Sequence, residues 1–180
     1  MRDLSMHILD IAQNSIQSGA KRVCLSIQMQ ADGWLLFSAK DDGHGMPPRL
    51  LAHAAEPFVT TGTARRVGLG LPLLKQSAER TGGSLTIESK MEQGTLVTAR
   101  MDRRSMDCIP LGDVCASFLT LVMLNPQKPD FLLQATSPKG QACFDTRTAR
   151  SVLGGRPLGP NDYGWVKESI DQAFKPILEV

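Results

Sequence analysis

The sequence contains no long apolar run and no apolar leader. Its longest apolar stretch, Phe118 to Leu124, is seven residues long and includes Thr120, whereas a membrane-spanning helix needs about 20. The N-terminal residues lack the apolar core of a signal peptide. We therefore expect a cytoplasmic protein with no membrane partner.

Blocks of like charge and closely spaced cysteines are also absent. Lys and Arg total 20 against 18 Asp and Glu, and without a basic tail we expect no nucleic acid partner. The cysteines form no Cys-x-x-Cys pair and have no histidine at metal spacing, so we expect free thiols in a reducing compartment rather than a disulfide or metal site. They are Cys24, Cys108, Cys115 and Cys143.

A chain of 180 residues with 42% hydrophobic residues can fold as one domain, with room for a small addition. Hydrophobic periodicity predicts an α+β fold, with helices at residues 4–18, 49–55 and 71–80 and strands at 23–29, 34–39, 85–89 and 95–101.

A second region follows, with a predicted helix at 114–124, a hairpin of 131–135 and 142–145, and a helix at 161–178 that Pro176 should stop or kink. We divide the chain into residues 1–102 and a small C-terminal α/β region, 103–180. The second region matches no motif, so its role is open.

A polar stripe runs along the first predicted helix, through His7, Asp10, Asn14 and Gln17. Residues three and four apart share a helix face. The Asn14 amide oxygen suits Mg²⁺, and the Asp10 carboxylate can accept a proton from a nucleophile. The alternative is that the stripe is only the solvated face of an amphipathic helix.

The segment Asp41-Asp42-Gly43-His44-Gly45-Met46 directly follows a predicted strand. Glycines let a backbone approach a ligand closely, and an aspartate at a strand end can accept a hydrogen bond from an exocyclic amine such as that of adenine. A polar turn would also account for this hexapeptide.

Gly68-Leu69-Gly70-Leu71 opens another predicted helix. Backbone amides at such a start form an anion site, and the preceding Arg65 and Arg66 could reach phosphate oxygens. A flexible hinge is the alternative here, and Gly94-Thr95 could be only a hairpin turn.

The order and spacing of these segments resemble the nucleotide-binding boxes of the gyrase, heat-shock chaperone, histidine kinase and MutL (GHKL) ATPase superfamily. Asp10-x-x-x-Asn14 is similar to the N box, and Asp41-x-Gly43-x-Gly45 is similar to the G1 box. Glu56-Pro57-Phe58 with Thr60-Thr61 is similar to the F box. The segment Gly68-Leu69-Gly70-Leu71 is similar to the G2 box, and Gly94-Thr95 is similar to the final Gly-Thr. Residues 56–101 are most similar to the ATP-binding domain of bacterial sensor histidine kinases.

The resemblance implies a two-layer α/β sandwich of the Bergerat type that binds ATP and Mg²⁺ beneath a lid. By position, Asn14 would hold Mg²⁺ and Asp41 would bind the adenine amino group. Asp10 stands where the hydrolysing branches place a catalytic glutamate, with a shorter reach. The other implied ATP-binding residues are Gly43, Gly45, Met46, Thr61, Arg65, Arg66, Gly68, Leu69, Gly70, Leu71 and Thr95.

The sequence departs from the kinase pattern in three places. Gln17 replaces a lysine found in many kinases, the lid between Phe58 and Gly68 is short, and only three residues precede the first helix, so we expect no phosphoacceptor hairpin. We expect His7 to line the pocket or the helix surface rather than accept a phosphoryl group, and His44 and His53 are no better acceptors.

Two functions of different classes follow from the resemblance. The first is a kinase-like enzyme that phosphorylates a partner protein or hydrolyses ATP. The alternative is a non-catalytic regulatory module whose ATP state sets docking to a protein partner. The partner's identity and the oligomeric state stay open.

Overall fold

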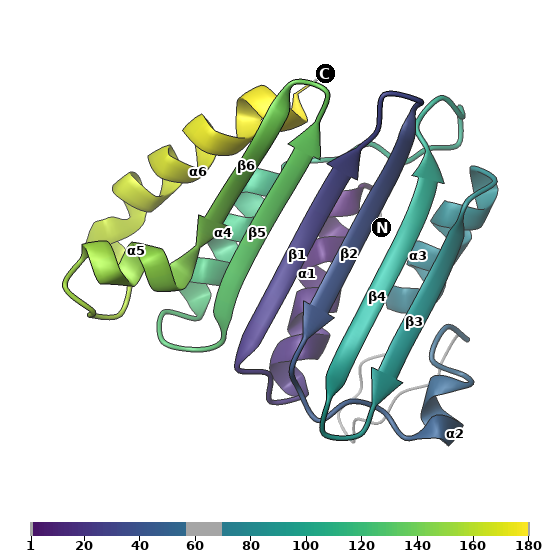
Figure 1. Ribbon diagram of the computed structural model, residues 1–180, viewed down its shortest axis with the longest axis horizontal. Helices are drawn as coiled ribbons and strands as arrows, with labels where there is room; N and C mark the ends of the chain where they lie inside the picture. Colours follow the sequence, from purple (N-terminus) through teal and green to yellow (C-terminus); the bar gives the residue numbers. More distant parts are fainter. Residues whose placement is uncertain (1, 57–69, 180) are drawn as a thin grey trace.

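One mixed sheet runs through both halves of the chain (Figure 1). We analysed a computed structural model in which residues 2–56 and 70–179 are described. The sheet has six strands in the order β3-β4-β2-β1-β5-β6; only β1 and β5 run parallel, and every other neighbouring pair is antiparallel. The strands are β1 (Arg22–Met29), β2 (Trp34–Asp41), β3 (Ser84–Lys90), β4 (Gly94–Asp102), β5 (Asp130–Ser137) and β6 (Gly140–Asp145).

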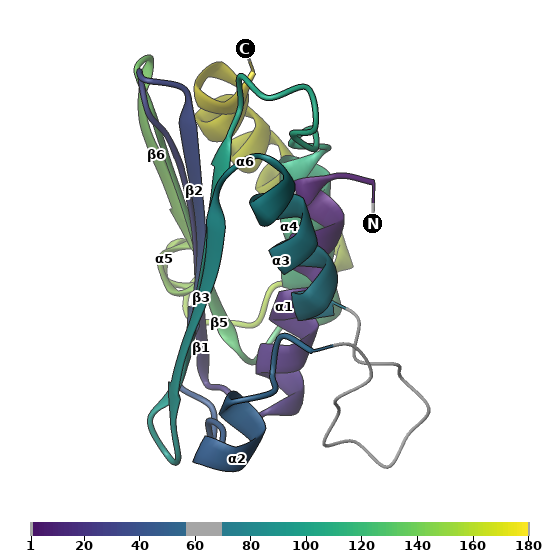
Figure 2. The same ribbon diagram turned by 90° about the vertical axis from the view of Figure 1, so that its right-hand side faces the viewer.

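Helices form a second layer on one face of this sheet (Figure 2). They are α1 (Leu4–Gln17), α3 (Gly70–Arg80), α4 (Val114–Leu124) and α6 (Tyr163–Leu178). Three short helices lie at the ends and edge of the sheet: α2 (Pro48–Leu51), α5 (Thr146–Val152) and the 3₁₀ turn Pro160–Asp162. Alternate residues of β1, β2 and β5 are buried beneath the helices, so the core lies between the two layers. The two-layer α/β fold predicted from the sequence is confirmed.

The first helix, α1, owes its position to an N-terminal cap and one buried stripe. The Asp3 carboxylate accepts a hydrogen bond from the Met6 amide, which satisfies one of the unpaired donors at the helix start. Gly19 follows the helix with φ of +72°, a conformation that glycine adopts at little cost. The buried stripe consists of Leu4, Ser5, His7, Ile8, Ile11, Ala12 and Ser15.

The C-terminal region extends the sheet of the first region. Strand β5 pairs with β1 along its length, with Leu25 opposite Leu133, and both side chains are fully buried. Above them, the Phe118 ring of α4 makes edge-on contacts with Phe131 and Phe144, at centroid distances of 6.4 and 5.9 Å. The two regions therefore share one sheet and one core, while their division into separate domains at residue 102 stays a prediction.

Several elements differ from the sequence-based expectation. Helix α2 ends at Leu51, where residues 49–55 were predicted, and α5 was not predicted because its residues carry no apolar stripe. Helix α6 continues past Pro176 to Leu178. A stop at Pro176 is therefore wrong, while a kink there stays a prediction; a proline in the last turn removes only one backbone donor.

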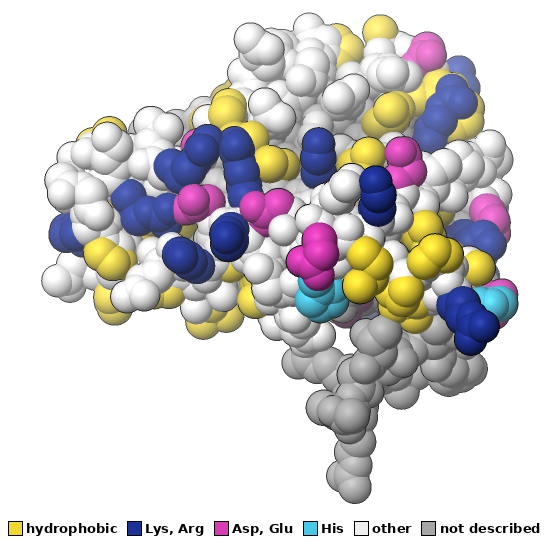
Figure 3. Space-filling model, turned by 60° about the horizontal axis from the view of Figure 1, so that its bottom comes forward, with side chains coloured by type: hydrophobic (Ala, Val, Ile, Leu, Met, Phe, Trp, Pro, Cys, Tyr) yellow, Lys and Arg dark blue, Asp and Glu magenta, His cyan; other side chains and the backbone are white. Residues whose placement is uncertain are grey.

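Basic side chains, with a few acidic ones among them, lie over the end of the molecule that carries α5 and the adjoining strand ends (Figure 3). Arg147 and Asp145 are 2.7 Å apart, and Arg150 pairs with Asp130. Arg147 and Arg150 are therefore each paired with a neighbouring carboxylate. Within residues 2–56 and 70–179, no helix is long and apolar enough to cross a membrane.

Candidate functional site

A buried carboxylate ends strand β2 and organises the loop that follows it. Asp41 is 9% exposed. Its Oδ2 accepts a 2.7 Å hydrogen bond from the Ser15 hydroxyl, and its Oδ1 accepts from the amides of Gly43 (2.9 Å) and Thr95 (3.3 Å). An ionised carboxylate has about four acceptor positions. Three donors thus orient Asp41 and leave capacity for one more.

The glycine-rich loop after Asp41 is held at both ends. The His44 amide donates to the Ser18 carbonyl at the end of α1, and the His44 carbonyl accepts from the Glu92 amide in the β3–β4 turn. The Met46 amide donates to the Ser89 hydroxyl at 2.8 Å. The loop therefore has a fixed path between α1 and the β3–β4 hairpin.

Two glycines are required where this loop passes the hairpin. Gly45 has φ of +67°, and a Cβ there would lie 2.1 Å from the Lys90 carbonyl oxygen. Gly94 has φ of +84°, and a Cβ there would lie 2.0 Å from the Asp41 carbonyl oxygen. Because both obstacles are backbone atoms, no side-chain movement relieves them.

We expect Gly45→Ala to lower the free energy of unfolding by at least about 1–2 kcal/mol, since the left-handed conformation alone costs that much and the contact with Lys90 adds to it. Chemical denaturation measures the change. The matched control is Gly164→Ala in α6, where an added Cβ meets no atom within 4 Å and stability should not fall. Equal midpoints for Gly45→Ala and the wild type would contradict the expectation.

Helix α3 begins directly over a second carboxylate. A Cβ on Gly70, the first residue of α3, would lie 1.6 Å from Asp10 Oδ2. The carboxylate of α1 is therefore packed against the start of α3, where the partial positive charge of a helix N-terminus favours an anion. The structure thus brings together Asp10 and Gly70, two of the residues singled out from the sequence.

The remaining predicted residues divide into two groups. Asn14 is exposed one turn along α1 from Asp10, and Leu71 is half-buried against the core. Thr95 is half-buried, and its hydroxyl lies 2.9 Å from that of Ser89. The predictions for Thr61, Arg65, Arg66, Gly68 and Leu69 lie outside the described residues, as does the F box beyond Glu56.

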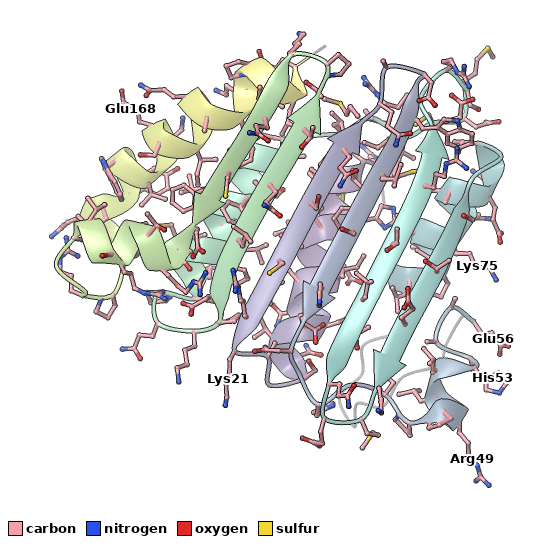
Figure 4. The ribbon with its side chains drawn as sticks, in the orientation of Figure 1. Lys21, Arg49, His53, Glu56, Lys75 and Glu168 are labelled. Carbon is pink, nitrogen blue, oxygen red and sulfur yellow. The ribbon has the colours of Figure 1, made fainter. Side chains whose placement is uncertain are left out.

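The described start of the F box faces away from the sheet. His53 and Glu56 lie next to each other after α2 and point outward (Figure 4). His53 Nδ1 and Glu56 Oε1 are 3.0 Å apart, and both side chains are more than half exposed. Neither is part of the Asp41 network.

Sequence reasoning missed two hydroxyl groups in the site. Ser15 was not among the predicted site residues, yet its hydroxyl donates to Asp41, 26 residues later. Ser89 lies at the end of β3, donates to the Gly94 carbonyl and accepts from the Met46 amide. The position of Ser15 among the apolar residues Ile8, Ile11 and Ala12 was the signal available for it, while Ser89 offered none.

The residues present suit a magnesium ion that is held mainly by a ligand. Mg²⁺ commonly binds one or two protein oxygens together with phosphates and water. Asn14 offers an accessible amide oxygen. Among the described residues, no three His, Cys, Asp or Glu side chains gather into a metal cluster.

The structure defines a two-layer α/β protein, and comparison with known proteins identifies its family. The chain belongs to the histidine kinase-, DNA gyrase B- and HSP90-like ATPase family, whose model matches residues 2–105. It therefore carries an ATP-binding module of the kinase-like type.

Curated relatives match over this module. The chain is similar to sporulation kinase D of Bacillus subtilis, with 36% identity over 92 residues that cover 51% of this chain and 18% of the relative. It is also similar to the sensor histidine kinase DcuS of Escherichia coli, with 41% identity over 58 residues that cover 32% of this chain and 10% of the relative. The chain thus matches less than a fifth of the length of these kinases.

A solved structure shares the fold over a longer part of the chain. The N-terminal domain of a DNA repair protein superposes with a TM-score of 0.54 and 15% identity, covering 79% of this chain and 52% of that one. Residues 2–105 make up less than 79% of the chain, so the superposed part extends beyond them. The shared fold therefore reaches into the C-terminal region.

Proposed function

We propose that this protein binds Mg²⁺-ATP at the end of β2 and transfers the γ-phosphoryl group to a partner protein or to water. The observation that carries the proposal is that helix α1 contacts both candidate segments: its Ser15 donates to Asp41, and its Asp10 is packed against Gly70. Asp41 is fixed beside the glycine loop, and Asp10 lies at the start of α3. Family membership supports ATP as the nucleotide.

Adenine recognition falls to Asp41 in this proposal. Its carboxylate accepts from Ser15, Gly43 and Thr95 and retains room for the adenine amino group. Gly43 and Gly45 allow the backbone to pass beside the base, and Met46 and Thr95 line the same end. Orientation by three internal donors means that the carboxylate need not reorganise when the base binds.

Phosphoryl transfer falls to the α1 and α3 end. Asn14 would hold Mg²⁺, which when bound neutralises phosphate charge. Asp10 would take the proton of the attacking water or partner nucleophile while the γ-phosphoryl bond to ADP breaks. Gly68, Leu69, Gly70 and Leu71 would present backbone amides to the phosphates, with Arg65 and Arg66 as further contacts.

Asp41→Asn is expected to weaken ATP binding about 10- to 100-fold, or about 1–3 kcal/mol. The single amide oxygen of an asparagine is needed by the Gly43 and Thr95 amides, so its NH2 group, which cannot accept a hydrogen bond, replaces the other carboxylate oxygen. Calorimetric titration with Mg²⁺-ATP measures the change. Asp42→Asn is the matched control, since Asp42 Oδ1 accepts from the Lys21 and Arg22 amides and an amide oxygen can do the same. Unchanged affinity in Asp41→Asn would place the base elsewhere.

One experiment separates enzyme from binding module. The protein is incubated with γ-labelled ATP, alone and with cell extract, and both released phosphate and labelled proteins are measured. Label on a partner supports the kinase, and phosphate release alone supports the ATPase. ATP binding with neither product would leave a non-catalytic module whose ATP state sets docking.

A further inference from the structure

A buried histidine lies on α1 one turn before Asp10. His7 is 1% exposed, so of its two expected places, the pocket lining and the helix surface, the helix surface is wrong and the pocket lining stays a prediction. The spacing of three residues places it on the same face of α1 as Asp10. That face belongs to the α1 and α3 end of the proposed site, here called the phosphate end. His7 is therefore a second titratable side chain on the same face as Asp10.

The ring of His7 has no hydrogen-bond partner in the part of the chain that the structure describes. Neither Nδ1 nor Nε2 meets a donor or acceptor among residues 2–56 and 70–179. Burial lowers its pKa to about 4, so the ring is neutral at physiological pH and carries one donor and one acceptor. Leaving such a group unpaired costs about 1–3 kcal/mol, which a leucine or phenylalanine at this position would avoid.

The backbone of Gly70 acts on this ring. The Gly70 backbone favours the charged form of His7, as a carbonyl beside a ring N–H does. The same glycine is packed against the Asp10 carboxylate. Two side chains of α1, one turn apart, therefore meet the first residue of α3.

We propose that His7 is a positioning residue of the phosphate end: with nucleotide bound, its neutral ring donates a hydrogen bond to the Gly70 carbonyl and thereby holds the start of α3 at a fixed distance from Asp10. This inference rests on the proposed ATP site. It accounts for a buried polar ring that has no hydrogen-bond partner among residues 2–56 and 70–179, because a start of α3 held on the phosphates would bring the Gly70 carbonyl into range. His7 does not touch the reacting atoms and acts through Asp10.

Two substitutions test the role. His7→Phe fills the volume without a hydrogen bond, and we expect phosphate release or transfer to fall about tenfold while the Kd for ATP stays within about threefold. His7→Asn keeps a donor and an acceptor and should recover most of the rate. The control is Met6→Ala at the neighbouring position, which is 44% exposed and should match the wild type.

Nuclear magnetic resonance of the ring nitrogens gives a reading that needs no turnover. In ¹⁵N-histidine protein, the signals absent from His7→Phe belong to His7. A non-hydrolysable ATP analogue should move them toward the values of a hydrogen-bonded neutral ring, and ADP should move them less.

The outcomes are separable. If the wild type binds the analogue but the His7 signals do not move, or if His7→Phe retains the wild-type rate, the inference is wrong and the ATP site stands. If calorimetry shows no nucleotide binding by the wild type, the proposed function fails and this inference falls with it.

Discussion

Asp10→Asn is expected to cut phosphate release or transfer at least tenfold while ATP affinity stays within about threefold, a shift of only about 0.7 kcal/mol. The carboxylate lies at the start of α3, where the γ-phosphate is proposed to sit. In the ground state it contributes little to binding, because it repels phosphate. An effect on kcat without one on Kd is the signature of a group used in the transition state.

Glu168→Gln on α6 is the control for this loss of charge. Glu168 lies far from the α2 end of the sheet (Figure 4), and a glutamine there can still accept from Gln172. Single-turnover assays and calorimetry on the two variants give rate and affinity separately. Equal rates for Asp10→Asn and the wild type would remove Asp10 from the reaction.

Phe118→Ala is expected to lower the free energy of unfolding by about 3–5 kcal/mol and to destabilise both halves together. Phe118 is fully buried in α4 and packs on Phe131 and Phe144 of the strands that continue the sheet. Because β5 pairs with β1, losing this packing weakens the sheet that also carries Asp41.

The chain's two tryptophans, one in each half, can report on this cooperativity. Trp34 is in β2 and Trp165 is in α6, so Trp34→Phe and Trp165→Phe backgrounds isolate each half in urea unfolding. Coincident transitions that Phe118→Ala shifts equally would show one cooperative unit. A Trp34 transition that Phe118→Ala leaves in place would instead support a separate domain at residues 1–102. Leu124→Ala, at an exposed position of the same helix, should change stability by less than about 0.5 kcal/mol.

Local patterns were enough to predict most of the fold. The helix at the N-terminus and the two hairpins of the first region follow from periodicity, because apolar spacing of 3.6 or 2 sets which face is buried. The parallel pairing of β1 with β5 could not be predicted in this way, since it joins residues about a hundred positions apart and leaves no local trace. Helix α5 escaped for a related reason: it is held by the Asp145 cap and has no stripe of its own.

Two contacts in the candidate site join an aspartate and a glycine that both belong to predicted motifs. Asp41 with Gly43 and Asp10 with Gly70 are close in the structure, as the ordered boxes indicated. Ser15 could not be assigned, because a serine on a buried stripe is indistinguishable from a small core residue until its partner is known. The environment of His7 was missed for the same reason, since burial depends on α3 packing across α1.

The position of β5 in the sheet has a consequence during synthesis. Strand β1 ends at Met29, and the strand that pairs with its other edge begins at Asp130, so that strand leaves the ribosome about a hundred residues later. At about 5–20 residues per second, that edge waits about 5–20 s with its backbone donors and acceptors open to any other extended chain. During synthesis the first region therefore exposes an unpaired strand edge for several seconds, until β5 is made and pairs with β1.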